Sequence, residues 1–319
     1  MKHLGCKYLF NSIYFSYDSL WHCCFILNEH VSEFFVLKDY NGGKINWEKI
    51  FEIKKQLRED LKKGNVPPNC HNCVNLIEQE WDERNKIDEI FVSHHTTCNS
   101  KCYYCYIEKE KERFSKLKGY DLYNTFKDMY KKGIIDDSIV LHLGGGEPTI
   151  FSQFEKIMKL FLSQGSGNIL VPTSGIKHSP TLEKALKLGK AITIVSIDSA
   201  DKETYKKIKQ VDAFDKVVAN LKKYTKANPE RVLVKYIICP GINDSREHIE
   251  KWYNLLLEIG VKKAAVDIEV WYMRECRDEV SSVVGPLIDY FEEKAHELGM
   301  DCELYCYAQQ FRHEESQKQ

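Results

Sequence analysis

The sequence predicts an α/β fold in which a partial (β/α)6 barrel of the TIM type follows a small, cysteine-rich N-terminal domain. From about residue 86, strand-like and helix-like patterns alternate along the chain, which is typical of consecutive βα units. The strand-like runs are continuously apolar, as parallel strands covered on both faces are. We therefore expect an N-terminal domain over residues 1–85, the barrel over residues 86–311 and a polar tail over residues 312–319.

The elements of the barrel are predicted from these patterns. Strands are expected at Glu89–Ser93, Ile139–Leu143, Asn168–Thr173, Ala191–Asp198, Val232–Ile238 and Ala264–Tyr272. Apolar residues at helical spacing predict helices at Leu122–Lys132, Gln153–Leu162, Thr181–Leu188, Phe214–Tyr224 and Arg246–Ile259. Because chemistry in such folds gathers at the C-terminal ends of the strands, the residues that follow each strand are candidate site residues.

The first 85 residues follow a different pattern. Ile13–Ser16 and Leu20–Phe25 predict a hairpin that turns at Asp18. Asn46 is a candidate N-cap for a helix that ends at Gly64. One face of that helix carries Ile50, Ile53, Leu57 and Leu61.

Composition narrows the class of partner. The chain has 319 residues, a formal net charge of −1 and 43% hydrophobic residues, so no global electrostatic argument favours nucleic acid or an anionic membrane. The N-terminus lacks the pattern of a signal peptide, and no apolar run approaches the ~20 residues that span a bilayer. Twelve cysteines in such a chain indicate metal sites or free thiols rather than disulfides. We expect a cytoplasmic protein that binds neither membranes nor nucleic acid.

Three cysteines stand close together directly after the first barrel strand. Cys98, Cys102 and Cys105 form the run CNSKCYYC, with C-x3-C-x2-C spacing. Three thiolates at this spacing can ligate three irons of a [4Fe–4S] cluster, and the fourth iron then stays open. The alternatives are core cysteines or part of a zinc site, although zinc knuckles usually pair C-x2-C with a second, distant pair.

Two further groups of residues follow later strands. Gly144, Gly145 and Gly146 precede Glu147 at a strand end; glycines there let the backbone approach a ligand, and a carboxylate accepts from a cation. A turn is the alternative. Ser196 and Asp198 are two apart on a predicted strand, so both side chains point to the same face. A helix cap is the alternative there.

Together these elements resemble the radical SAM (S-adenosylmethionine) superfamily over about residues 86–275. The resemblance implies that SAM chelates the open iron through its amino and carboxylate groups. One-electron reduction then cleaves SAM into methionine and a 5′-deoxyadenosyl radical, which abstracts hydrogen from a substrate. The resemblance also implies a reduced flavodoxin or ferredoxin-type electron donor.

The same resemblance implies roles for individual residues in holding SAM. Gly145, Gly146 and Glu147 look like the element that binds the amino group. Ser196 and Asp198 look like the contact with the ribose or the carboxylate.

Further candidates lie in the cysteine loop and after later strands. Tyr104 stands where the family borders adenine, and Asn243 lies in what resembles a SAM-proximal turn. Lys235 lies within an apolar strand, and a buried lysine needs a partner; the SAM carboxylate and Glu147 are candidates, and a position at the strand rim is the alternative. Ser174 stands where many relatives carry Asn.

The N-terminal cysteines predict a second centre. The set consists of Cys6, Cys23, Cys24, Cys70 and Cys73. It resembles the cysteine–hairpin–cysteine plan of auxiliary-cluster domains of the SPASM and twitch types, but here it precedes the barrel. Successive strand residues face opposite ways, so one of Cys23 and Cys24 should ligate, with Cys24 preferred. A second [4Fe–4S] cluster is expected, and structural zinc is the alternative.

The expected activity is that of a radical SAM oxidoreductase or maturase. The resemblance to auxiliary-cluster enzymes implies modification of a ribosomal peptide or protein side chain as the favoured reaction. The alternatives are oxidation or epimerisation of a carbohydrate or small metabolite and, outside enzymes, a zinc-binding interaction protein. Cys276 follows the sixth strand and is a candidate hydrogen donor to a substrate radical, as in epimerases of this superfamily; an ordinary small buried residue is the alternative.

Overall fold

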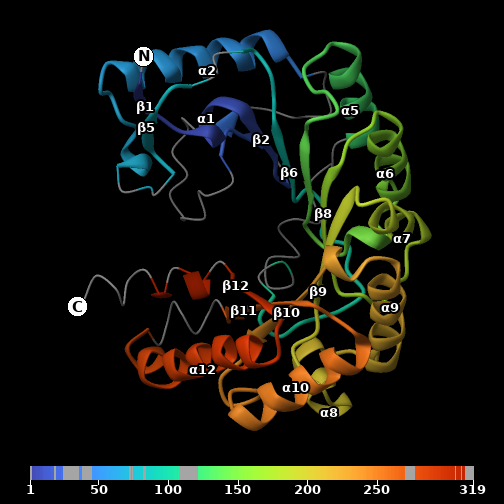
Figure 1. Cartoon of the computed structure of the whole chain (residues 1–319). Helices are drawn as coiled ribbons and strands as arrows, with labels where there is room; N and C mark the ends of the chain where they lie inside the picture. Colours follow the sequence, from blue (N-terminus) through green and yellow to red (C-terminus); the bar gives the residue numbers. More distant parts are fainter. Residues whose placement is uncertain are drawn as a thin grey trace. The chain divides into compact units, whose positions relative to one another are not determined.

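The computed structural model divides into two compact units (Figure 1). Unit 1 comprises Met1–Thr96, Lys111–Gly146 and Ser152–Ile169, and unit 2 comprises Thr97–Glu110, Glu147–Phe151 and Leu170–Gln319. The structure describes residues 2–17, 19–23, 36–37, 45–71, 73, 75–81, 84–105, 107, 121–269, 277–305, 307–309 and 311–312.

Unit 1 contains a mixed sheet with the order β4-β3-β2-β6-β7. Its strands are β2 (Ser12–Phe15), β3 (Leu20–Trp21), β4 (Val36–Leu37), β6 (Glu89–Val92) and β7 (Val140–Leu143). β2 pairs antiparallel with β3 and parallel with β6, which pairs parallel with β7. A separate two-stranded sheet joins β1 (His3–Gly5) to β5 (Ile77–Gln79). The antiparallel pairing of β2 with β3 confirms the predicted hairpin. Its turn residue Asp18 and the last two residues of its second predicted strand lie outside the described residues.

The helices of unit 1 are α1 (Lys7–Asn11), α2 (Trp47–Lys62), α5 (Leu122–Lys131) and α6 (Phe154–Ser163), and η1 (Pro68–Cys70) is a short 3-10 turn. The Asn46 side chain accepts a hydrogen bond from the Lys49 backbone N–H at 3.1 Å, so the predicted N-cap of α2 is correct. Beyond α2, Gly64 has a φ of +81°, a conformation that favours glycine. The buried residues of α2 are Trp47, Ile50, Lys54, Leu57, Arg58 and Leu61.

Unit 2 contains a largely parallel sheet with the order β8-β9-β10-β11-β12. Its strands are β8 (Asn168–Thr173, whose first two residues belong to unit 1), β9 (Ala191–Ser196), β10 (Val232–Ile238), β11 (Lys263–Ile268) and β12 (Asp301–Leu304). The helices are α7 (Pro180–Lys187), α8 (Lys202–Lys209), α9 (Phe214–Ala227), α10 (Arg246–Ile259) and α12 (Arg277–Glu297). Two 3-10 turns, η2 (Pro148–Ile150) and η3 (Pro229–Arg231), complete the unit.

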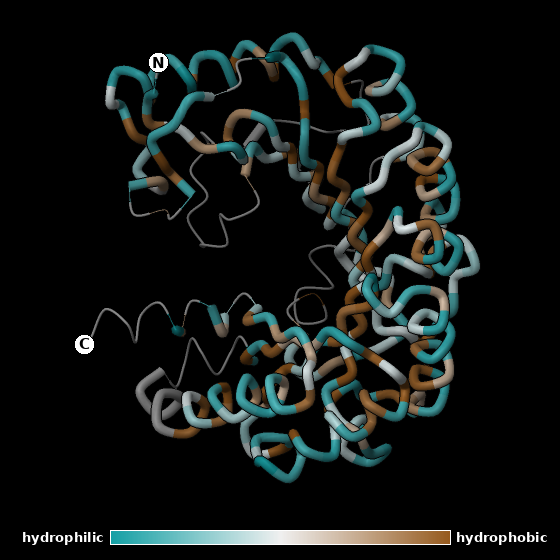
Figure 2. The backbone as a smooth tube through the Cα atoms, in the orientation of Figure 1, coloured by the Kyte–Doolittle hydropathy of each residue, from teal (hydrophilic) through white to brown (hydrophobic). Residues whose placement is uncertain are grey.

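The strands of both units are predominantly hydrophobic, whereas the helices alternate between hydrophobic and hydrophilic residues (Figure 2). In β10 every residue except Lys235 is buried, as expected for a strand covered on both faces. The predicted α/β fold with a parallel sheet is therefore confirmed. No helix in the described part of the chain is long and apolar enough to cross a membrane; the cytoplasmic location stays a prediction.

The predicted strands and helices of the barrel are present. Three of them, β8, β10 and α10, have the predicted ends, and the others have shifted ends. The largest difference among the helices is at α9, which continues to Ala227 instead of ending at Tyr224. β11 ends at Ile268 rather than Tyr272, and residues 270–276 lie outside the described residues. Sequence patterns did not predict α8, α12 or β12.

The N-terminal region supplies strands to the sheet that contains β6. Parallel pairing of β2 with β6 places Phe15 beside Val92, and both side chains are buried. An apolar strand beside β6 protects an edge that would otherwise expose unpaired backbone groups. Contacts between residues do not divide the chain at position 85, and the domain boundary proposed there stays a prediction.

Candidate active site

The cysteine triplet forms a loop in unit 2. The Ser100 hydroxyl lies 3.4 Å from the Cys98 sulfur and 3.6 Å from the Cys102 sulfur. The Cys105 backbone N–H donates to the Cys102 carbonyl at 2.9 Å. Cys98 is exposed, and Cys102 and Cys105 are half-buried. Three thiols that solvent can reach fit the donor set of an iron–sulfur cluster.

Backbone hydrogen bonds connect this loop to the end of α8. Lys101 donates to the carbonyl of Lys209 at 3.0 Å, and Tyr103 donates to that of Ile208 at 3.1 Å. These are C-terminal carbonyls of a helix, which lack partners within the helix itself. The chain then leaves α8 through Gln210, which has a φ of +52°. The cysteine loop thus satisfies the end of α8 while α8 positions the loop.

A buried polar triad makes a second connection. The Lys209 ammonium lies 2.6 Å from Asp198, and the Tyr104 hydroxyl donates to Asp198 and accepts from Lys209, both at 2.7 Å. Asp198 and Lys209 are 1% and 2% exposed. Burial opposes the charge on Lys209, but Asp198 and Cys102 raise its pKa above the usual value. The lysine therefore stays protonated and pairs with Asp198.

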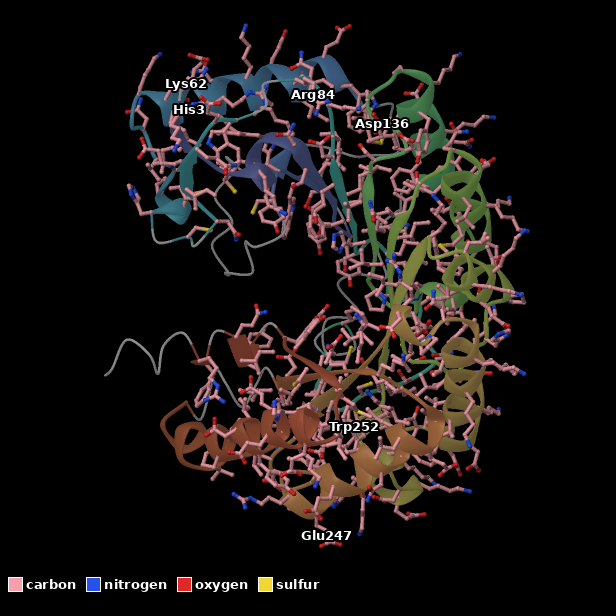
Figure 3. The ribbon with its side chains drawn as sticks, viewed as in Figure 1. His3, Lys62, Arg84, Asp136, Glu247 and Trp252 are labelled. Atoms are coloured by element: carbon pink, nitrogen blue, oxygen red, sulfur yellow. The ribbon has the colours of Figure 1, made fainter. Side chains whose placement is uncertain are left out.

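Asp198 and its neighbours also position the chain beyond β10. Asp198 accepts from the Ile237 backbone N–H at 3.1 Å. The Asn243 amide donates to the Asp198 carbonyl at 2.7 Å and to the Ile237 carbonyl at 2.9 Å, and it accepts from the Cys239 N–H at 2.6 Å. The Trp252 indole, labelled in Figure 3, donates to the Ile197 carbonyl at 2.5 Å. The predicted contacts Asp198 and Asn243 are thus already engaged in connecting strand ends.

Glu147 lies buried at 2% exposure. Its Oε1 accepts from the Thr149 N–H at 3.1 Å, the Thr149 hydroxyl at 2.6 Å and the Thr173 hydroxyl at 2.7 Å. Its Oε2 accepts from the Ser174 N–H at 2.6 Å. The Glu147 N–H donates to the Thr97 carbonyl at 2.7 Å, just before the cysteine loop. Because a carboxylate has about four lone-pair positions, Oε2 retains room for another donor.

Ser174 provides a third connection. Its hydroxyl donates to the Asn99 side-chain oxygen at 3.0 Å, inside the cysteine loop. The following Gly175 has a φ of +73°, and a Cβ there would lie 3.1 Å from a Val195 methyl group and 3.2 Å from a Val217 methyl group. Only glycine fits this turn without strain. The serine that departs from the family pattern therefore links the end of β8 to the cysteines.

Lys235 and Ser196 face each other on neighbouring strands. They are register partners in the β9–β10 pairing. The Lys235 ammonium lies 3.8 Å from Asp267 and 4.6 Å from the centre of the Tyr305 ring. The ion pair of Lys235 is with Asp267, and the Lys235 side chain is 16% exposed. Contacts of Lys235 with SAM or with Glu147 stay predictions.

Gly145 and Gly146 belong to unit 1, whereas Glu147 belongs to unit 2. Gly146 donates to the His95 carbonyl at 2.8 Å. Gly145 has a φ of +100°, and a Cβ there would lie 3.0 Å from the same oxygen. These glycines therefore lie close to the backbone of the segment that follows β6, and their approach to a ligand stays a prediction.

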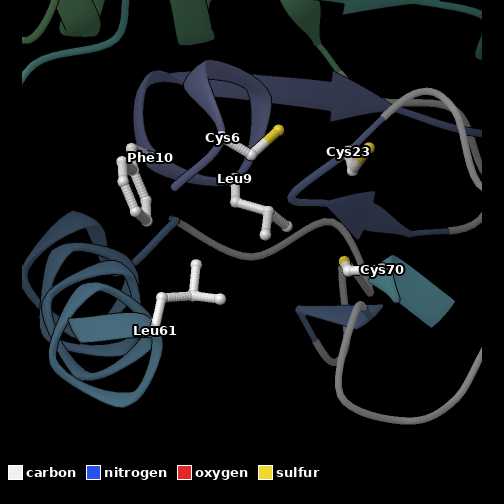
Figure 4. Close-up of a cluster of buried hydrophobic side chains, with 6 residues drawn as sticks. All are labelled: Cys6, Leu9, Phe10, Cys23, Leu61 and Cys70. Atoms are coloured by element: carbon white, nitrogen blue, oxygen red, sulfur yellow. The ribbon is translucent and has the colours of Figure 1, made fainter. Parts of the chain in front are cut away.

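The N-terminal cysteines gather in unit 1. Cys6, Cys23 and Cys70 are buried in one cluster with Leu9, Phe10 and Leu61 (Figure 4). Burial raises the pKa of the Cys70 thiol to about 11, with further contributions from Cys6 and Cys73. The Cys73 backbone N–H donates to the Cys70 carbonyl at 3.1 Å, which places Cys73 beside this group.

Two predicted residues, Cys24 and Cys276, lie outside the described residues. Within the residues that are described, no group of three or more His, Cys, Asp or Glu side chains is arranged to hold a single metal ion.

Lys209 and Lys54 are the important residues that the sequence did not indicate. Both are lysines on the buried face of an amphipathic helix. In α2, the positions Ile50, Lys54, Leu57 and Leu61 follow helical spacing. A lysine within such an apolar stripe was the available signal.

Comparison with known proteins defines the class. Residues 92–256, just over half of the chain, match the model of the Radical SAM superfamily, and the chain belongs to this superfamily. It is therefore an enzyme of the class that employs a [4Fe–4S] cluster and SAM.

Particular relatives are more distant. The chain is 26% identical over 175 residues to a probable GTP 3′,8-cyclase of Sulfurisphaera tokodaii, over 55% of this chain and 54% of the relative. It is 26% identical over 186 residues to the GTP 3′,8-cyclase of Psychromonas ingrahamii, over 56% of this chain and 53% of the relative. The chain thus spans about half the length of these curated relatives.

Among solved structures, Streptococcus suis SuiB bound to its precursor peptide SuiA has a TM-score of 0.54 and 12% identity, over 88% of this chain and 59% of that one. At this identity the likeness shows the fold alone.

Proposed function

We propose that Cys98, Cys102 and Cys105 hold the [4Fe–4S] cluster at which SAM is reductively cleaved. The observation that carries this proposal is the number of independent connections to the cysteine loop. The loop is hydrogen-bonded to the end of α8, to Asp198 after β9 and to Ser174 after β8. A site held by several rigid elements is preorganised for its ligand. When bound, the cluster supplies the electron that cleaves SAM into methionine and a 5′-deoxyadenosyl radical.

The residues of this chain bind and orient SAM. Glu147 Oε2, with its remaining lone pair, accepts from the SAM amino group; Gly145 and Gly146, which precede it in the sequence, stay predicted contributors. Ser196 and Lys235 are adjacent across β9 and β10, and together they offer a hydroxyl and a cation to the SAM carboxylate.

Other predicted contacts act by positioning. The ring of Tyr104 borders adenine, and its orientation is fixed by the hydrogen bonds of its hydroxyl to Asp198 and Lys209. Asp198 and Asn243 hold the ends of β9 and β10 and need not contact SAM. A buried, fully hydrogen-bonded network of this kind makes the geometry unique.

A second centre is proposed in unit 1. Cys6, Cys23, Cys70 and Cys73 supply four thiolates for an auxiliary [4Fe–4S] cluster, and zinc is the alternative. The burial of Cys23 together with Cys6 and Cys70 supports Cys23 as the ligand from its pair with Cys24. Four thiolate ligands leave no open iron, so this centre would transfer electrons or stabilise the fold.

For the substrate, we take a small metabolite as the leading candidate. The named activity of the curated relatives concerns GTP, a small molecule, which supports the carbohydrate or metabolite alternative over the peptide that the sequence alone favours. A flavodoxin or ferredoxin-type protein is the proposed electron donor. Incubation of the reduced enzyme with deuterated GTP, sugars or peptides, followed by mass spectrometry of 5′-deoxyadenosine, distinguishes these substrates.

The test of the central proposal is anaerobic purification followed by SAM cleavage. We expect brown protein with about seven to eight irons per chain and acid-labile sulfide. Cys102→Ala should abolish 5′-deoxyadenosine formation, whereas Cys302→Ala on β12 should retain it. Unchanged 5′-deoxyadenosine formation by Cys102→Ala would refute the assignment. Colourless protein with stoichiometric zinc at the triplet would favour the zinc-binding interaction protein.

A further inference from the structure

We propose that Lys54 is the counter-charge of the N-terminal cysteine centre and raises the reduction potential of that centre. The inference rests on the proposed auxiliary [4Fe–4S] cluster and assigns to it a residue that is not a ligand.

The first observation is the complete burial of Lys54. Its side chain is 0% exposed, and its ammonium donates to the carbonyls of Leu9 at 2.8 Å and Ser12 at 2.7 Å. These carbonyls belong to α1 and β2, the elements between Cys6 and Cys23 in the chain. Two neutral carbonyls use two of the three N–H donors of an ammonium and contribute no negative charge.

The second observation is the kind of charge that surrounds Lys54. Among the described residues, the ionisable groups that interact electrostatically with Lys54 include Arg58, Cys23 and Cys6, and the buried imidazole of His22. Arg58 is 3% exposed, and its guanidinium lies 5.7 Å from the centre of the Phe10 ring. Two basic side chains, Lys54 and Arg58, therefore lie beside an apolar cluster in which the groups able to become anions are thiols.

A buried charge is retained in proteins when an opposite charge compensates it. Deprotonated Cys6 and Cys23 provide this compensation once they ligate a metal centre. A [4Fe–4S]2+ core with four thiolates carries a net charge of −2, and addition of one electron makes it −3. Because Coulomb attraction grows with that charge, a fixed cation stabilises the reduced form more than the oxidised form.

The inference predicts a measurable change in potential. In the full chain with Cys98, Cys102 and Cys105 changed to Ala, only the auxiliary cluster contributes to the spectrum. There, Lys54→Met should lower the equilibrium constant for one-electron reduction by at least tenfold, which is 59 mV for a one-electron couple. Potentiometric titration with dithionite, followed by electron paramagnetic resonance, measures this. Lys55→Met, an exposed neighbour in α2, is the matched control.

A second variant separates charge from hydrogen bonding. Lys54→Gln keeps a donor for the carbonyls of Leu9 and Ser12 but removes the charge, so it should shift the potential as Lys54→Met does. Loss of iron from both variants, with an unchanged far-UV circular dichroism spectrum and full iron in Lys55→Met, also supports the counter-charge.

Two outcomes overturn the inference, and they are distinguishable. If the background protein retains about four irons and Lys54→Met has the potential of Lys55→Met, the centre stands and the role of Lys54 is refuted. If the background protein contains no iron, or zinc instead, the auxiliary cluster itself is refuted. The proposal that the unchanged chain cleaves SAM at the triplet would still stand.

Discussion

The two groups of cysteines differ in what surrounds them. In unit 2, Cys98, Cys102 and Cys105 lie on an exposed or half-buried loop held by hydrogen bonds from other elements. In unit 1, Cys6 and its neighbours are buried among apolar side chains, with the basic side chains of Lys54 and Arg58 nearby. An accessible site suits a cluster that binds an exchangeable molecule, and a closed one suits electron transfer or structure. The two groups therefore consist of the same type of residue and differ in exposure and in the side chains around them.

Replacement of one cysteine in each group is the most direct test of whether the two groups have different roles. Cys102→Ala should reduce SAM cleavage to background, because the cluster loses one of three protein ligands. Cys70→Ala should reduce the iron content by about half, to the four irons of one cluster, and retain uncoupled SAM cleavage. Iron analysis and chromatography of 5′-deoxyadenosine measure both. Equal loss of SAM cleavage in both variants would show that the two groups do not act separately.

The buried ion pair of unit 2 should account for the next largest effect. Lys209→Met leaves the Asp198 carboxylate buried without its cation, which costs about 3–5 kcal/mol of stability. Urea unfolding measures this cost. Lys202→Met is the control, because its pair with Asp215 is exposed and solvent screens such pairs so that they contribute little to stability. If Lys209→Met destabilises the protein no more than Lys202→Met does, the triad does not stabilise the cysteine loop.

The carboxylate of Glu147 is expected to matter for both stability and SAM binding. In Glu147→Gln, an amide NH2 group replaces one carboxylate oxygen and can no longer accept from the donors that surround it. Each buried donor left without an acceptor costs about 1–3 kcal/mol. We expect SAM affinity to fall roughly tenfold or more, since 1.4 kcal/mol corresponds to a factor of ten. Equilibrium binding of SAM to the loaded enzyme tests this. Unchanged affinity would assign Glu147 a structural role only.

The sequence was informative where local chemistry determines the structure. Continuous apolar runs indicated the strands of the barrel, and Asn46 correctly marked the start of α2. The cysteine spacing located the loop of the site. Long-range pairs could not be predicted in this way: Lys209 meets Tyr104 across 105 positions, and nothing near Lys209 in the sequence indicates a buried partner. The hydrogen-bond partners of Lys54 could not be predicted for the same reason, since they lie in α1 and β2.

The helices that carry the two buried lysines differ in the chemistry of their N-caps, and this gives the smallest predicted effect. Asn46 caps α2, and Asp201 caps α8 by accepting from the Thr204 N–H at 2.8 Å. Replacement of either cap by Ala should cost about 1 kcal/mol at neutral pH. Urea unfolding of metal-free protein measures both.

The two caps should diverge in acid. Burial alone would raise the pKa of Asp201, but hydrogen bonds from Thr204 and Ser199 lower it below the usual value. A carboxyl with a lowered folded-state pKa contributes stability above its unfolded pKa of about 3.9, and this contribution is lost as the pH falls through the folded-state pKa. The cost of Asp201→Ala should therefore shrink in that range, whereas the cost of Asn46→Ala, a neutral cap, should stay constant. Parallel decreases in both costs would mean that acid weakens the helices generally rather than the Asp201 cap.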